Sequence, residues 1–331
     1  MKKLFAAILA LAMVLSTTAA MAEKTLVYAE VNPADTVVGK TAAAFKEKIE
    51  ELSAGEIKID IQYAGVLGTE AQILDDLAMG GDSVDIMRIS AFALSSYGCP
   101  KATLLSLPYT FVSGEHFWNF ATSDLAQEFL LEPQNSDKCD VPVRGLFYFH
   151  EGFRHFFLKK DVASVADLAG LKIRVSDDPV MNGMVKGLGA IPTVVSFSEL
   201  YSALQTGVVD AAEQPTTNYK ANAFQEVAPY LWQDGHTLGA VQVIIREDVY
   251  EDMSDEELAW LSEACAYAGD FARNLVDGAE AEVIEQLTAD GKTVIPVTAE
   301  QKAELASLCA DTVNQYTVGY EDLYAQIVAM Q

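Results

Sequence analysis

The feature that most constrains the fold is an alternation of short apolar strands with amphipathic helices near the start of the chain. Residues 25–31 form an apolar stretch typical of a buried strand, and residues 57–63 alternate apolar and polar side chains as a half-buried strand does. Between them, apolar residues recur at helical spacing after Pro33. A third strand is predicted over 84–89, after a helix that Thr69 can cap. Repeated strand–helix units of this kind predict an open α/β sheet.

The same alternation returns in the second half of the chain. Strands are predicted over 172–175 and 191–195, with a helix over 179–187 between them. Two further apolar strands, 142–149 and 237–246, lie where the chain is expected to pass from one unit to the other. The sequence therefore predicts two α/β domains joined by hinge strands.

The longest helix is predicted to begin at Ser254, where Ser254 and Glu257 form a capping box. No proline interrupts the apolar stripe before Pro296. About 35 residues of helix would extend some 50 Å, which exceeds one small domain. We therefore expect this helix to span both domains. The expected division is 23–149 plus about 240–278 for domain I, and 150–239 plus about 279–331 for domain II.

Residues 1–22 have the pattern of a cleaved export signal. Lys2 and Lys3 precede an apolar segment over 4–15, and residues 20–22 form an Ala-Met-Ala cleavage site. The apolar segment is too short to span a bilayer, so we expect export with removal of the signal. Removal takes the formal net charge from −26 to −28, because two lysines are lost. A chain this acidic would repel nucleic acid and anionic membrane surfaces.

The sequence offers little support for catalysis. No glycine-rich loop has phosphate or dinucleotide spacing, and no G-x-S-x-G motif occurs. His150 and His155 are five residues apart, whereas a zinc-protease helix needs a spacing of four. We therefore expect no enzyme, no cofactor and no metal. Four cysteines are too few for a disulfide scaffold, and their pairing is left open: Cys99, Cys139, Cys265 and Cys309.

Three arginines are predicted at or near the ends of strands, where ligands of open α/β sheets sit. Arg174 lies at the end of one predicted strand, Arg154 just past another, and Arg88 near the end of a third. A guanidinium group holds a carboxylate through two parallel hydrogen bonds, which lysine cannot reproduce. The alternative for each arginine is a surface or interdomain ion pair with one of the 48 acidic residues. We predict an anion pocket between two domains that close as a hinge.

Several motifs are weak individually but specific in their order and spacing. They are Leu67-Gly-x-Glu70, Leu107-Pro-Tyr109, Gly152-x-Arg154, the segments 167–175 and 197–210, and Glu213-Gln214-Pro215. In this order they resemble the solute-binding proteins of TRAP transporters, the DctP family, over nearly the whole chain after residue 25. The resemblance implies a type II-like, two-domain periplasmic binding protein with hinge strands and a domain-spanning helix.

By that resemblance, the protein closes on an organic acid anion in the periplasm and delivers it to the small and large membrane subunits of a TRAP transporter. Arg174 would pair with the ligand carboxylate, and Arg154 would assist it. Gln214 would hydrogen-bond near the carboxylate, at a position where the family often has asparagine. Phe197 would pack against the ligand, and Glu70 would line the far wall.

Three further residues are expected near the ligand. Asp177 would suit ligand hydroxyls, Arg88 would suit a second carboxylate, and Asn32 belongs to the wall of the first domain. Sugar acids and C4-dicarboxylates both remain open, whereas sialic acid is disfavoured because Ser90 and Ala93 stand where sialic-acid binders carry Glu and Arg. We expect a monomer. The alternative function is a ligand-binding protein of another transporter class or of a sensory system.

Overall fold

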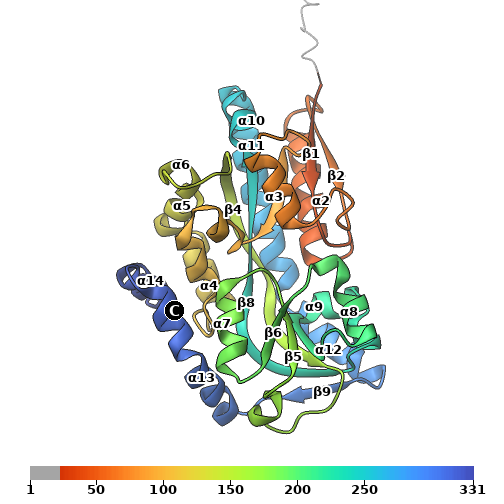
Figure 1. Cartoon of the computed structure of the whole chain (residues 1–331). Helices are drawn as coiled ribbons and strands as arrows, with labels where there is room; N and C mark the ends of the chain where they lie inside the picture. The colour runs from red at the N-terminus through yellow and green to blue at the C-terminus, as the bar shows by residue number, and fades with distance from the viewer. Residues whose placement is uncertain (1–22) are drawn as a thin grey trace, which may run out of the picture.

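The structure is a computed structural model that describes residues 23–331. The expected export signal, residues 1–22, lies outside the described residues. Within 23–331 no helix is both long and apolar enough to cross a membrane. A single sheet of nine strands lies at the centre of this part of the chain, in the order β2-β1-β3-β8-β4-β7-β5-β6, with β9 paired to β8. Helices pack around the sheet (Figure 1).

Two helices connect three parallel strands at one end of the sheet, as the sequence predicted. In chain order these elements are β1 (Lys24–Ala29), α2 (Val37–Leu52), β2 (Ile57–Gln62), α3 (Glu70–Ala78) and β3 (Ile86–Ser90). The predicted cap at Thr69 is present, because its side chain accepts the amide of Gln72 and the Gln72 side chain accepts the Thr69 amide.

A second group of alternating strands and helices forms the other end of the sheet. Its elements are β5 (Lys172–Val175), α7 (Pro179–Gly187), β6 (Ile191–Val194), α8 (Leu200–Thr206) and β7 (Ala211–Pro215). Since β5 is parallel to both β6 and β7, this group is a second α/β unit. The two groups confirm the predicted α/β class.

Two long antiparallel strands join the groups and run through the middle of the molecule (Figure 1). β4 (Val143–Leu158) pairs with β7 on one side and with β8 (Tyr230–Arg246) on the other, and β8 continues the sheet to β3. Both strands are longer than predicted. Three register shifts interrupt their pairing, and one of them surrounds Gly152, whose φ of 101° favours glycine. Bulges of this kind bend a strand.

The long helix that reaches both groups of strands is present, but it is bent. α11 (Asp255–Val276) begins with the predicted capping box of Ser254 and Glu257 and packs on α2 and β4. It ends before Gly278, which has a φ of 88°. α12 (Ala279–Ala289) then packs against α9 and β9. The predicted 35 or so helical residues are therefore divided by one glycine in a left-handed conformation.

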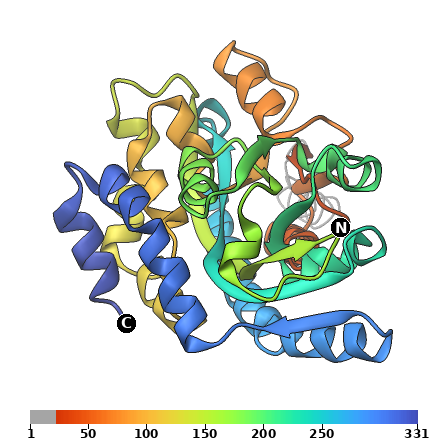
Figure 2. The ribbon, with the colours of Figure 1, turned by 60° about the horizontal axis from the view of Figure 1, so that its bottom comes forward.

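Most of the remaining helices pack against the long strands β4 and β8, and one further strand pairs with β8. The remaining elements are α4 (Gly114–Ala121), α5 (Asp124–Leu130), α6 (Glu132–Asn135), α9 (Thr216–Ala221), α10 (Glu247–Glu251), β9 (Thr293–Pro296), α13 (Ala299–Thr317) and α14 (Glu321–Val328). Figure 2 shows the C-terminal helices, in blue, beside the yellow helices of the 114–130 region. There His116 Nε2 lies 2.7 Å from the carbonyl oxygen of Ile327.

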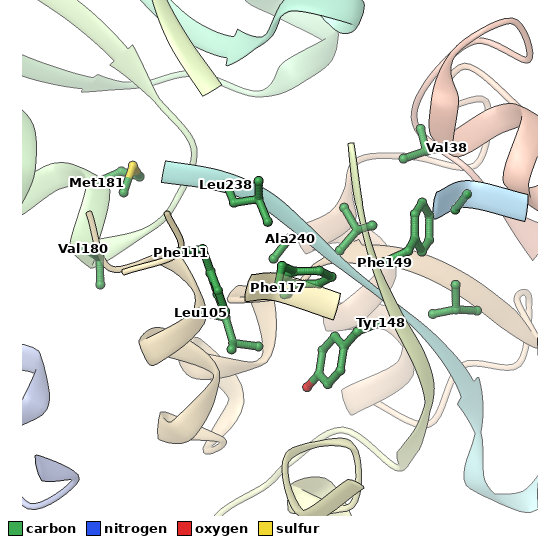
Figure 3. Close-up of a cluster of buried hydrophobic side chains, with 14 of the residues drawn as sticks. Val38, Leu105, Phe111, Phe117, Tyr148, Phe149, Val180, Met181, Leu238 and Ala240 are labelled. Atoms are coloured by element: carbon green, nitrogen blue, oxygen red, sulfur yellow. The ribbon is translucent and has the colours of Figure 1, made fainter. Parts of the chain in front are cut away.

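An aromatic core lies where β4, β8 and α4 meet. Phe149 of β4 and Phe117 of α4 are fully buried, and Figure 3 shows them in one cluster with Val38, Leu238 and Ala240. Burying one phenylalanine side chain contributes roughly 1.5–3 kcal/mol. This core contacts both long strands and therefore stabilises their register. The register in turn fixes the positions of the side chains on β4 and β8.

The structure brings two of the four cysteines together. Cys99 and Cys139 belong to one hydrophobic cluster, and the Cys139 thiol donates to the carbonyl oxygen of Val141 at 3.4 Å. The neighbouring Cys99 thiol lowers the pKa of Cys139, which favours its reactive thiolate form. Cys265 and Cys309 lie on different helices, α11 and α13. All four are free thiols in the structure.

We expect Cys99 and Cys139 to form a disulfide when the folded protein is treated with oxidised glutathione. The Cys139 thiolate would attack glutathione disulfide, and Cys99 would then displace the second glutathione. Closing a loop of about 40 residues stabilises a protein by about 4 kcal/mol in the chain-entropy model. Non-reducing peptide mapping by mass spectrometry should find one cross-linked pair, and Cys265→Ser should leave that pattern unchanged. A cross-link involving Cys309 would contradict this prediction.

Candidate functional site

A cavity of about 340 Å³ is lined by residues from both groups of strands. Its place follows from the topology, because the carboxyl ends of the parallel strands β1, β3 and β5 lead into it. All eight residues that the sequence analysis singled out line this cavity: Asn32, Glu70, Arg88, Arg154, Arg174, Asp177, Phe197 and Gln214.

Arg174 is the cavity arginine without a carboxylate partner in residues 23–331. It lies on β5, is only 2% exposed, and donates from Nε to the carbonyl of Val195 at 2.8 Å. Its Nη1 has no hydrogen-bond partner in the described chain. Burial lowers the pKa of Arg174 to about 10, so the side chain stays charged at neutral pH. A buried cation with an open nitrogen is suited to receive an anionic group.

Arg154 lies within β4, and not just past the end of a shorter strand as predicted, because β4 continues to Leu158. Its Nε and Nη2 donate to the Glu213 carboxylate at 2.5 and 2.9 Å. Its Nη1 is 3.6 Å from Oε1 of Glu151. Since Glu213 occupies two of the three nitrogens, only Nη1 is left to approach a ligand.

Arg88 makes the ion pair that the sequence analysis considered as the alternative. Its Nε and Nη2 donate to Glu30 at 3.1 and 2.7 Å, and its Nη1 donates to Glu70 at 3.0 Å. Although burial disfavours its charge, these carboxylates raise the pKa of Arg88. All three nitrogens are occupied, so the expectation that Arg88 suits a second ligand carboxylate is not supported. The parallel pairing of β1 with β3 explains this, because it places Glu30 beside Arg88.

The other predicted residues differ in burial and partners. Gln214 on β7 is buried, and Asn32 is buried with its amide nitrogen donating to Glu30 at 3.0 Å. Phe197 is half-buried in a 3₁₀ turn. Asp177 is exposed at the end of β5. The cavity therefore combines a buried floor of charged and amide groups with a partly exposed rim.

The cavity residues that the sequence reasoning missed include a buried acid and a buried amide, Glu151 and Asn218. Both are buried, and Asn218 Nδ2 donates to Oε2 of Glu151 at 2.8 Å. Burial raises the pKa of Glu151. An acidic residue beside an apolar strand was a usable signal, but the motif Gly152-x-Arg154 begins one residue after Glu151. Residues 23–331 contain no cluster of three or more potential metal ligands.

A buried cluster of charged groups lies beneath Arg154. His236 Nδ1 is 2.6 Å from Asp234, and its Nε2 is 3.5 Å from Glu213. Burial would lower the pKa of His236, but Asp234 and Glu213 raise it to about 9. Burial would likewise raise the pKa of Glu213, but Arg154 and His236 lower it to about 2. The cluster joins β4, β7 and β8 and holds Arg154 in place.

Comparison with known proteins assigns the chain to one family. Residues 28–317 match the DctP model, described as bacterial extracellular solute-binding protein, family 7. A sialic acid-binding periplasmic protein of Vibrio cholerae is 30% identical, over 88% of this chain and 88% of that protein. Of the solved structures, a TRAP periplasmic solute-binding protein from Pseudomonas putida with bound D-glucuronate has a TM-score of 0.86 at 27% identity, covering 93% of this chain and 97% of the other.

A second solved structure extends the comparison to another ligand. The TRAP periplasmic solute-binding protein of Sulfurospirillum deleyianum, with bound succinate, has a TM-score of 0.84 at 26% identity and covers 94% of this chain and all of its own. The family model covers most of the chain, and the fold agrees with both solved relatives over nearly their whole length. This protein therefore belongs to the DctP family, the solute-binding proteins of TRAP transporters.

Proposed function

We propose that this protein captures an organic acid anion in the cavity and delivers it to the small and large membrane subunits of a TRAP-type transporter. The observation that carries the proposal is the open Nη1 of Arg174, a buried cation on the cavity wall. A ligand carboxylate would supply the counter-charge that the described chain lacks there. Solved relatives with bound D-glucuronate and succinate support an acid as the ligand.

In the proposed complex, the eight residues predicted from the sequence contact different parts of the ligand. Arg174 holds the carboxylate, while Nη1 of Arg154 and the amide of Gln214 contact it from neighbouring strands. Phe197 packs against the carbon skeleton of the ligand. Asp177 accepts a hydroxyl at the rim, and the opposite wall is formed by the residues of the first group of strands, Asn32, Glu70 and Arg88.

The proposed capture requires that the two groups of strands close on the ligand. The division predicted from the sequence belongs to this proposal: 23–149 with about 240–278, and 150–239 with about 279–331. β4 and β8 would act as hinge strands, because they connect the groups and their pairing shifts register around Gly152. Export to the periplasm after removal of residues 1–22 completes the proposal, in keeping with the periplasmic relatives.

A thermal-shift screen tests the proposed function. A library of sugar acids and C4-dicarboxylates should contain ligands that raise the melting temperature. A ligand present at 100 times its dissociation constant adds about 2.7 kcal/mol to the free energy of unfolding. The matched control is a sugar without the carboxylate, such as D-galactose beside D-galacturonate, which should give no shift. If no acid shifts the melting temperature, or if the neutral sugar does so equally, the proposed function is wrong.

A further inference from the structure

We propose that the cavity selects acids that have one carboxylate and otherwise donate hydrogen bonds, as polyhydroxylated monocarboxylates do, and that Glu151 excludes a second carboxylate. This inference rests on the proposed function and narrows its ligand class.

Of the three cavity arginines, two are already paired with carboxylates of the protein. Arg88 uses all three of its guanidinium nitrogens on Glu30 and Glu70. Arg154 uses two nitrogens on Glu213. Arg174 alone of these three arginines has no carboxylate partner among the described residues and keeps an open nitrogen. A first ligand carboxylate therefore finds a buried counter-charge at Arg174, whereas a second would meet only arginines whose charge a carboxylate of the protein already balances.

Acidic side chains outnumber basic ones in and directly beside the cavity. Three arginines are opposed by five carboxylates that line the cavity or pair directly with the lining arginines: Glu30, Glu70, Glu151, Asp177 and Glu213. Like charges repel strongly when they are removed from water, because little solvent screens them. A second negative charge on the ligand would thus be disfavoured, whereas an uncharged hydroxyl would not be.

Two buried side-chain amides leave their oxygens available to accept hydrogen bonds from the ligand. Asn32 donates its amide nitrogen to Glu30 at 3.0 Å, and Asn218 donates its amide nitrogen to Glu151 at 2.8 Å. An ionised carboxylate only accepts hydrogen bonds, so each amide must turn its oxygen elsewhere. Both oxygens are buried without a partner in residues 23–331. A buried acceptor without a donor is costly, and a ligand hydroxyl would supply that donor.

Glu151 is placed to distinguish a hydroxyl from a carboxylate. It lines the cavity, is 4% exposed, and receives a hydrogen bond from Asn218 on Oε2. Its Oε1 lies 3.6 Å from Nη1 of Arg154, which is too long for a hydrogen bond. Oε1 can therefore accept a ligand hydroxyl. A carboxylate at the same position would meet a like charge.

Isothermal titration with matched acids tests the inference. Galactarate differs from galactonate and from galacturonate by a second carboxylate at one end of the same carbon chain, and glucarate is related in the same way to gluconate and glucuronate. We expect at least one monocarboxylate to bind at least 100-fold more tightly than its matched dicarboxylate and than succinate. Equal or tighter binding of a dicarboxylate would overturn the inference while leaving the proposed function intact. Failure of every acid to bind would instead overturn the proposed function.

Substitution at Glu151 tests the assigned residue. Glu151→Gln keeps the size of the side chain but removes its charge, so the preference for the monocarboxylate should fall at least tenfold. Glu132→Gln, at a buried acid outside the cavity, is the matched control and should leave the preference unchanged. An unchanged preference in Glu151→Gln would contradict the role. If that variant does not fold, Asn218→Ala must weaken monocarboxylate binding about tenfold, and unaltered binding would overturn the proposed contacts.

Discussion

Arg174→Ala is expected to weaken binding of the best acid by roughly 30- to 5,000-fold, because losing one partner of a buried charge pair costs about 2–5 kcal/mol. The ligand carboxylate would lose the one cavity arginine that has no carboxylate partner among residues 23–331, since Arg88 pairs with Glu30 and Glu70 and Arg154 pairs with Glu213. Isothermal titration of the acid found in the thermal-shift screen measures this loss.

Two further variants make the Arg174 result specific. Arg174→Lys keeps the charge but loses the planar fork, so its affinity should lie between those of the unaltered protein and Arg174→Ala. Arg246→Ala removes an arginine that pairs with Asp248 outside the cavity and should bind the acid normally. The melting temperature of Arg174→Ala without ligand should not fall, because an uncompensated buried charge has been removed. Unchanged affinity in Arg174→Ala would refute its assignment as the carboxylate-binding residue.

Glu213→Gln is expected to lower the free energy of unfolding by about 3–5 kcal/mol, since it leaves Arg154 buried without its counter-charge. Urea unfolding at neutral pH measures this effect. Glu247→Gln is the control, because the Arg144–Glu247 pair is more exposed, and such pairs contribute about 0–1 kcal/mol. An unfolding midpoint equal to that of the unaltered protein would show that the buried pair does not stabilise the fold.

The same cluster predicts a pH dependence of stability. The pKa of His236 is raised from 6.5 to about 9, so the stabilisation by its charged form is complete below pH 6.5 and is lost as the pH rises through 9. The pKa of Glu213 is lowered from 4.5 to about 2, so its contribution is complete above pH 4.5 and is lost as the pH falls through 2. In Glu213→Gln the loss of stability above pH 6.5 should be smaller, because one carboxylate that raises the pKa of His236 is absent.

The sequence predicted where the cavity residues lie better than it predicted which of them form ion pairs with one another. Arg88, Arg174 and Asn32 were expected on the two walls of one pocket because ligands of open α/β sheets sit at the carboxyl ends of strands, and the structure brings all three to the cavity. The partners of Arg88 were not predictable. Glu30 is 58 residues away in the chain, and only the order of the strands brings its carboxylate to this guanidinium.

Glu151 was missed for a related reason. Local pattern shows an acidic residue in an apolar strand, but not whether its carboxylate turns toward a cavity or toward an internal ion pair. Its orientation depends on Asn218, 67 residues later, and on the bulge between His150 and Phe153 in β4. Likewise, the bend between α11 and α12 depends on Gly278, whose left-handed conformation a helical pattern alone does not reveal.

The sequence by itself determined the α/β class, the family and eight of the residues that line the cavity, because these depend on local periodicity, helix caps and the order of short motifs. Tertiary structure decided which arginines are already neutralised and which one remains open. That outcome depends on contacts across the sheet between residues far apart in the chain, such as Arg154 with Glu213. Burial makes those pairings energetically important, because a charge removed from water is costly unless it has a partner in the protein or in the ligand.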